Sequence, residues 1–453
     1  MIMCSLIVLL LISLLPTKSG GAFASSKSTN NEKITISQEI LDLQSQHPIL
    51  KDPNEIMNSI ADSCDVLGID KFDVYGDYSD DESTSYLRRF EAEVAKHFGK
   101  EDAVFMPSGT MAQNIALLIH SGKEHIHLDH SKSNENYKMR FACHHTSHLL
   151  LWEEQSYSKL VGMEAVEIET KSDAVDGLRA PPLSLCHVDS VFKKEKERYN
   201  QESGHLGDTG LSTLIIELPH RELGGKLPSW NDVVSIGELC KKENIKYHCD
   251  GARIFEASAG YGKSVSDLAE PFDSIYISFY KGLGSISGAM LMGKKDFCDE
   301  ARVWLTRFGG NLYTLLPYAA SCWRGYRRHA LGEGSTMTFA NKFDKLKRVT
   351  EMIKTETVLS DIGAFDPCTP ETNMVRVYLK RSVDQCESAR DGVVQSCGMK
   401  VFSRIRSVEA PGLGYSEGFR AMFEWTMGEA NGAIDDEKFI HAWKEFCSRL
   451  ECM

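Results

Sequence analysis

The chain has 453 residues and a formal charge of −13, with 42% hydrophobic and 25% charged residues. This composition is typical of a globular protein and excludes a disordered or fibrous chain. The acidic balance argues against nucleic acid as a partner, because phosphate backbones are bound by clustered lysine and arginine. A chain of this length exceeds the size that a single hydrophobic core usually reaches. We therefore expect one large domain and one smaller domain.

The first 24 residues differ in composition from the rest. An apolar run at 6–15 precedes a stretch of small residues at 20–24, a pattern that resembles a cleavable signal leader. The run is too short to span a membrane stably. The Ala-Phe junction at 22–23 and the Ser/Lys-rich segment at 25–33 also resemble the import signal of complex plastids. The pattern therefore indicates the secretory pathway or a complex plastid, and the alternative is a cytoplasmic protein.

The remaining chain alternates between helical and strand patterns. Helices are predicted at 84–99, from 110 and at 233–242, and strands at 103–106, 214–218, 245–249 and 274–278. Such alternation predicts an α/β fold with a mostly parallel sheet covered on both faces. A helical pattern from 335, a strand at 374–379 and a helix at 439–448 indicate a smaller α/β domain. The predicted divisions are a leader at 1–24, an N-terminal arm at 25–70, a large domain at 71–334 and a small domain at 335–453.

Two chemical groups follow neighbouring strands in this pattern. Asp250 ends one buried strand and begins the sequence Asp-Gly-Ala-Arg, and Lys281 follows the next strand and precedes two nearby glycines. In an open α/β sheet, ligands bind at the edge where the strands end. A dinucleotide loop is disfavoured, because the spacing after Lys281 is G-x-G-x-x-x-G. The thirteen cysteines are scattered without any C-x-x-C pair, so no metal site is expected.

A third group joins a strand to a helix at Ser108, Gly109 and Thr110. The free N–H groups of a helix N-terminus are an anion site. A lysine, a carboxylate and a phosphate cradle are the fixtures that pyridoxal 5′-phosphate (PLP) needs, since the lysine forms a Schiff base and the carboxylate keeps the pyridine nitrogen protonated. Each feature alone is common in structural turns and caps, and their joint occurrence in this order predicts a PLP site.

These segments resemble the threonine aldolase and β-eliminating lyase family of fold-type I PLP enzymes. The resemblance covers 73–310, with weaker similarity to about 430, and its segments are 73–76, 90–93, 107–111, 147–148, 250–253, 281–284 and 372–374. It implies a seven-stranded, mostly parallel sheet in the large domain. It also implies a homodimer or homotetramer, in which Tyr75 and the loop at 309–313 reach a neighbouring subunit.

The resemblance assigns roles to single residues. Lys281 matches the Schiff-base lysine, Asp250 the partner of the pyridine nitrogen, and Arg253 the arginine near the phenolic oxygen and the substrate carboxylate. Ser108, Gly109 and Thr110 match the phosphate turn.

Further matches concern catalysis and the substrate. His148 matches the histidine stacked on the cofactor ring, with His144 and His145 as alternatives. His220 falls at the position of a second active-site histidine, so His148 and His220 are the candidate bases. Arg420 falls near the arginine that clamps the substrate carboxylate, and Tyr75 is a further substrate-binding candidate.

The substrate half of the site departs from the family pattern. The N-terminal R-S-D-T segment is absent, Tyr280 replaces a small residue, and ELPHRELGG replaces the usual E-N-T-H-N stretch. We therefore expect a divergent PLP lyase that cleaves a β-hydroxy-α-amino acid to glycine and an aldehyde. The alternatives are a β-eliminating lyase acting on another amino acid and a PLP-fold protein that binds without turnover.

Overall fold

The computed structural model describes residues 40–47, 52–71, 73–75, 85–122, 139–170, 180–203, 208–408 and 418–453. Residues 40–453 form one compact unit. The predicted leader at 1–24 and the first part of the predicted arm lie outside the described residues, and the predicted domain divisions remain predictions. Among the described helices, none is long and apolar enough to cross a membrane.

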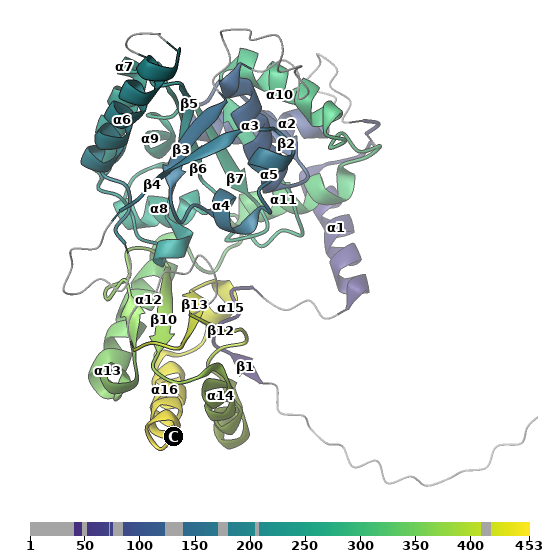
Figure 1. Cartoon of the computed structure of the whole chain (residues 1–453). Helices are drawn as coiled ribbons and strands as arrows, with labels where there is room; N and C mark the ends of the chain where they lie inside the picture. The colour runs from purple at the N-terminus through teal and green to yellow at the C-terminus, as the bar shows by residue number, and fades with distance from the viewer. Residues whose placement is uncertain are drawn as a thin grey trace, which may run out of the picture. The chain divides into compact units, whose positions relative to one another are not determined.

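A mixed seven-stranded sheet forms the centre of the larger part of the fold (Figure 1). Its order is β2-β8-β7-β6-β5-β3-β4, and every neighbouring pair is parallel except the two that involve β8. The carboxyl ends of the other six strands therefore lie at one edge. The strands are β2 (Asp102–Met106), β3 (Arg140–His144), β4 (Glu164–Ile168), β5 (Leu211–Glu217), β6 (Lys246–Asp250), β7 (Ser274–Ser278) and β8 (Ala289–Gly293).

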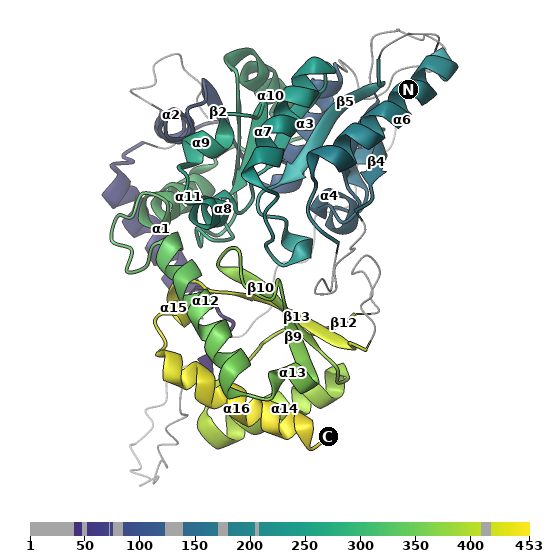
Figure 2. The same ribbon diagram turned by 90° about the vertical axis from the view of Figure 1, so that its left-hand side faces the viewer.

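Helices cover both faces of this sheet (Figure 2). Alternate residues of β5 face opposite sides: Leu214 and Ile216 pack with α2 and α7, whereas Ile215 packs with α3 and α10. The helices are α1 (Pro53–Leu67), α2 (Tyr86–Phe98), α3 (Gly109–Ser121), α4 (His148–Trp152), α5 (Ser156–Lys159), α6 (Leu185–Ser203), α7 (Trp230–Lys242), α8 (Ile254–Tyr261), α9 (Val265–Ala269), α10 (Lys295–Arg307) and α11 (Leu316–His329).

A second, antiparallel sheet has the order β12-β13-β10-β9. Val375 and Val377 of β10 point into a core shared with α12, α14 and α16, while Arg376 lies on the opposite face. The elements are α12 (Phe339–Glu356), α13 (Leu359–Ile362), β9 (Gly363–Asp366), β10 (Met374–Leu379), α14 (Val383–Cys397), β12 (Arg406–Ser407), β13 (Ala421–Thr426), α15 (Glu429–Gly432) and α16 (Asp436–Glu451).

The segment 40–47, at the start of the described chain, packs against the second sheet and its neighbouring strand β11 (Met399–Lys400). The strand β1 (Leu41–Asp42) of this segment pairs in parallel with β11. Leu43 is fully buried in the core of the second sheet, and its carbonyl accepts hydrogen bonds from Trp425 and Asn431. This segment is therefore an integral part of the second sheet's core.

The predicted α/β architecture with a mostly parallel sheet is confirmed. The predicted helix at 84–99 corresponds to α2, where Ser85 caps the first turn and Gly99 ends the helix at a φ of 64°. Strand β8 was not predicted, and it makes the sheet mixed.

Candidate active site

The segments that follow β3, β5, β6 and β7 meet at the carboxyl edge of the large sheet and enclose a small cavity. Its lining residues are His148, Glu217, Pro219, Arg221, Asp250, Ala252, Arg253 and Lys281. Four of the predicted site residues are among them. The cavity lies where an open α/β sheet is expected to bind its ligand.

Lys281 is a buried amine on the wall of this cavity. It lies three residues after β7, and its carbonyl oxygen is 2.7 Å from Nε2 of His47. Burial and the nearby Arg253 lower the pKa of Lys281 to about 8. A larger share of the amine is therefore neutral near physiological pH than in an exposed lysine, and a neutral amine is the nucleophilic form.

Asp250 ends β6 beside Lys281 and is the end point of a buried hydrogen-bond chain. Nε2 of Gln113 on α3 donates to Oδ2 of Asp250 at 2.7 Å. Oε1 of Gln113 lies 2.8 Å from Nε2 of His248, whose Nδ1 lies 2.7 Å from Oγ of Ser274. Nε2 of His120 lies 2.6 Å from the same hydroxyl.

The donor and acceptor of each hydrogen bond in this series can be assigned. The amide oxygen of Gln113 only accepts, so His248 must carry its proton on Nε2 and accept from Ser274 at Nδ1. Ser274 in turn accepts from His120. Every donor points towards Asp250, and aligned hydrogen bonds polarise one another. The chain thus favours the ionised carboxylate, whereas burial and the neighbouring Glu217 raise the pKa of Asp250.

His148 begins α4 at the cavity. Its backbone N–H donates to Oε1 of Glu217 at 2.6 Å, and its Nδ1 lies 3.4 Å from Oε1 of Glu153. Of the three candidate histidines, only His148 lines the cavity; His144 is buried against Thr146, and Nδ1 of His145 faces a backbone carbonyl. The ring of His148 is thus held by a carboxylate on one side and open to the cavity on the other.

The predicted phosphate turn follows β2 at the same edge. Ser108 caps α3 by accepting from the N–H of Met111 at 3.3 Å. A Cβ on Gly109 would fall 2.1 Å from the hydroxyl oxygen of Tyr276, so only glycine fits here. Gly109 thus packs against the ring of Tyr276, and Gly109 and Thr110 place their backbone N–H groups in the first turn of α3, where a helix has unpaired donors.

The second sheet reaches the cavity through Glu424 on β13. Its carboxylate lies 2.9 Å from Nε of Arg221 and 3.2 Å from Nη2 of Arg253. Burial raises the pKa of Glu424, but Arg221 and Arg253 hold it below its usual value. One carboxylate therefore spans the two arginines that line the cavity.

Besides the turn at 108–110, three predicted site residues are absent from the cavity lining. His220 is buried behind it, where Nε2 is 3.0 Å from Oγ1 of Thr146, although its neighbours Pro219 and Arg221 line the wall. Arg420 is exposed just before β13 and is not one of the cavity residues. Tyr75 is exposed and packs edge-on against Tyr313, with the ring centroids 5.4 Å apart.

Sequence reasoning missed Gln113, Glu217, Arg221 and Glu424. Glu217 ends the apolar run of β5 as Asp250 ends β6, so the same strand-end argument identifies it. Gln113 is a polar residue on a buried helix, and Glu424 is a lone acid in an apolar strand. Such isolated polar residues indicate a specific partner, although they do not indicate which one.

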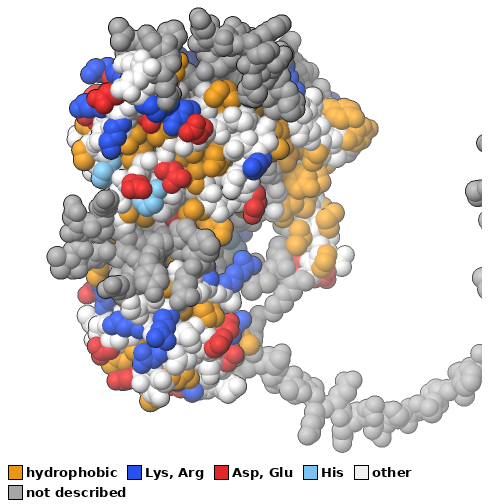
Figure 3. Space-filling view, in the orientation of Figure 1, with side chains coloured by type: hydrophobic (Ala, Val, Ile, Leu, Met, Phe, Trp, Pro, Cys, Tyr) orange, Lys and Arg blue, Asp and Glu red, His pale blue; other side chains and the backbone are white. Residues whose placement is uncertain are grey.

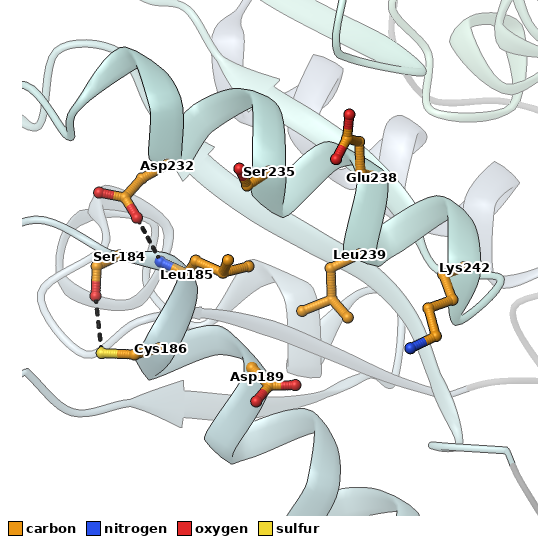
Figure 4. A pocket seen from close by; sticks show the side chains of 9 residues that line it. All are labelled: Ser184, Leu185, Cys186, Asp189, Asp232, Ser235, Glu238, Leu239 and Lys242. Carbon is orange, nitrogen blue, oxygen red and sulfur yellow. Dashed lines mark hydrogen bonds between the residues drawn. The ribbon is translucent and has the colours of Figure 1, made fainter.

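A larger hollow of about 700 Å³ lies between α6 and α7 on the outer surface (Figure 4). Among its lining side chains, Ser184 and Cys186 contact each other at 3.3 Å, and Asp232 accepts from the backbone of Leu185. It contains neither Lys281 nor Asp250. The chemistry of the lining residues, rather than size, identifies the cavity at Lys281 as the candidate site.

Comparison with known proteins agrees with this geometry. A family model described as beta-eliminating lyase matches residues 73–382. An uncharacterized protein of Caenorhabditis elegans is 28% identical over 367 residues, 79% of each chain. Low-specificity L-threonine aldolase 1 of Arabidopsis thaliana is 28% identical over 239 residues, 51% of this chain and 58% of that protein.

A solved structure shows the same similarity over a longer span. It is that of a Listeria monocytogenes protein assigned as an L-allo-threonine aldolase, with a TM-score of 0.70, 26% identity, and coverage of 91% of this chain and 97% of the other. The sequence matches to curated threonine aldolases span little more than half of those proteins. The chain belongs to the beta-eliminating lyase family, whose members are PLP-dependent.

Proposed function

We propose that this member of the beta-eliminating lyase family is a PLP-dependent aldehyde-lyase that cleaves a β-hydroxy-α-amino acid to glycine and an aldehyde. The observation that carries the proposal is the meeting of Lys281, Asp250 and His148 at one cavity. An amine, an acid and a positioned imidazole are the groups that this reaction requires.

The residues present fit PLP. Lys281 offers a buried amine with a lowered pKa, and Asp250 offers a carboxylate supported by Gln113. The N-terminus of α3 at Gly109 and Thr110 offers backbone donors for a phosphate, and the space there excludes any side chain at 109. When bound, PLP supplies an electron sink for negative charge at Cα of the substrate.

Asp250 holds a proton at the pyridine nitrogen in this proposal. The donors of the chain through Gln113 and His248 keep the carboxylate negative, so it attracts that proton. Arg253 binds the α-carboxylate of the substrate, a role that suits a guanidinium already facing a carboxylate.

His148 takes the proton from the substrate hydroxyl as the Cα–Cβ bond breaks. Glu153 contacts Nδ1 and orients the ring, which leaves Nε2 to exchange the proton. His220 remains a weaker candidate, because its Nε2 is directed to Thr146 behind the cavity. We therefore assign the base to His148 alone.

Labelling tests the cofactor half of the proposal. Borohydride reduction of the PLP-treated protein, followed by peptide mapping, is expected to place the label on Lys281, and Lys281→Ala is expected to remove it. Lys226→Ala is the matched control, since Lys226 is a partly buried lysine paired with Asp366 instead. A label on another lysine contradicts the proposal.

A substrate panel tests the reaction. Threonine, allo-threonine, phenylserine and β-hydroxyaspartate are supplied separately, and glycine, aldehyde and ammonia are measured. We expect glycine and aldehyde in equal amounts, and a loss of roughly 10²–10⁴-fold in kcat for His148→Ala. His145→Ala, a neighbouring histidine away from the cavity, is the control. Ammonia and keto acid without glycine indicate β-elimination instead.

A further inference from the structure

A cluster of guanidinium groups lies where the second sheet meets the cavity. This arginine cluster consists of Arg221, Arg253, Arg376 and Arg406. Among the described residues, the carboxylates that form ion pairs with these arginines are Glu222 and Glu424. Positive charge therefore exceeds negative charge within this group by two.

Glu222 belongs to the fixed part of the cluster. It is fully buried, lies 2.8 Å from Nη2 of Arg376, and accepts from Nε1 of Trp152 at 2.9 Å. Burial raises the pKa of Glu222, but Arg376 beside it brings the value down to about 2. Glu222 therefore stays ionised and pairs with Arg376, whose side chain has no solvent exposure.

Glu424 contacts the two arginines of the cluster that line the cavity. Its two oxygens face Arg221 and Arg253 separately, as the two oxygens of a bound carboxylate would. The single charge of Glu424 neutralises only one of these two guanidinium groups. Arg221 and Arg253 are thus arranged to contact carboxylate oxygens.

Arg406 is the arginine with the weakest carboxylate contact. Its Nη2 is 3.9 Å from Glu222, and its Nε faces the thioether sulfur of Met422, a poor acceptor. Arg406 and Arg221 lie over the same ring of Trp152, at 5.0 and 5.6 Å. The side chain of Arg406 is 30% exposed, so a ligand can reach it. Packing on one indole thus brings two guanidinium groups close to each other.

We propose that the substrate carries a second acidic group on its side chain, bound by Arg221 and Arg406 against Trp152, while Arg253 binds the α-carboxylate. The inference rests on the proposed function and names its substrate class: β-hydroxy-α-amino dicarboxylic acids such as β-hydroxyaspartate. The phosphate of PLP does not compete for this receptor, because its cradle lies at the N-terminus of α3.

The reaction balances for this substrate. The Cα–Cβ bond of β-hydroxyaspartate breaks, the hydroxyl proton leaves to the base, and the Cβ oxygen becomes the carbonyl of glyoxylate. The electron pair of the broken bond stays at Cα, which takes up one proton and gives glycine. No oxidant or other co-reactant is required.

Binding to the PLP-free full chain tests the receptor without any turnover. Isothermal titration calorimetry compares succinate, which has two carboxylates, with propionate, which has one. We expect succinate to bind at least roughly tenfold more tightly than propionate, because its second carboxylate makes one additional charge-assisted contact. Arg406→Gln is expected to remove this preference. Arg404→Gln, an exposed arginine two residues away with the same charge change, is expected to keep it.

Kinetics then distinguish this inference from the proposed function. We expect kcat/KM for β-hydroxyaspartate to exceed that for threonine, and Arg406→Gln to lower the former roughly tenfold more than the latter. Equal affinity for succinate and propionate in the unaltered protein, or an unchanged preference in Arg406→Gln, overturns the receptor even if threonine is cleaved. Succinate preference without glycine production from any substrate overturns the proposed aldol cleavage instead.

Discussion

Replacement of Gln113 by methionine tests the hydrogen-bond chain that supports Asp250. Methionine has nearly the length of glutamine but no amide, so it removes the donor to Asp250 at 2.7 Å and the acceptor for His248 at 2.8 Å. Gln113, Asp250 and His248 are all buried, so water does not readily replace the lost partners. The change thus isolates one link of the chain.

The expected magnitude follows from these two contacts. A hydrogen bond to a charged group contributes about 1.5–3 kcal/mol, and a neutral donor left unsatisfied in the interior costs about 1–3 kcal/mol. We therefore expect the PLP-free protein to lose roughly 3–5 kcal/mol of unfolding free energy. Because Asp250 becomes easier to protonate, we also expect PLP affinity to fall roughly tenfold or more.

Urea unfolding of the PLP-free protein and absorbance titration with PLP measure the two effects. Asn114→Leu is the matched control, because Asn114 is the adjacent buried amide on α3 and bonds to Ser156 and a backbone carbonyl instead. We expect the control to lose stability without losing PLP affinity. Wild-type PLP affinity in Gln113→Met would refute the role of the chain.

The remaining predictions concern charge and assembly. Because burial and Arg253 lower the pKa of Lys281 to about 8, covalent PLP attachment to the PLP-free protein should accelerate about tenfold per pH unit below that value and level off above it; a stopped-flow rate that is flat from pH 6 to 8 contradicts this. Asp250→Asn should weaken PLP binding at least as much as Gln113→Met and, even at saturating PLP, lower kcat by roughly 10²-fold or more, since a neutral pyridine is a poor electron sink; near wild-type turnover removes Asp250 from its role. Hydrophobic side chains gather over α1 in Figure 3, and Tyr75 and Tyr313 are also exposed, so we expect a homo-oligomer that Tyr313→Asp weakens; a fully active wild-type monomer in light scattering is the contrary result.

The sequence predicted the cofactor half of the candidate site because that half depends on strand order. Asp250 and Lys281 follow adjacent parallel strands, so their placement at one edge follows from the pattern alone. Strand β8 was missed because a short apolar run with no alternation does not reveal its direction.

The substrate half depends on tertiary contacts that no local pattern encodes. Glu424 contacts Arg253 across 171 residues of chain, so its role depends on how the second sheet meets the first. His220 has the same local context as Arg221, yet a short 3-10 turn at Arg221–Leu223 directs the two side chains to different places. Sequence position alone does not indicate which of two residues at a tight turn faces the cavity.

The segment 40–47 has a consequence for the order in which the protein assembles during synthesis. Leu43 contacts Trp425 and Asn431, so it emerges from the ribosome some 380 residues before its partners. The large sheet can form first, since domains made early generally fold as units. His47, which contacts the backbone of Lys281, is the last residue of this segment. Completion of the candidate site on the lysine side is therefore expected to wait until β13, the last strand, has been synthesised.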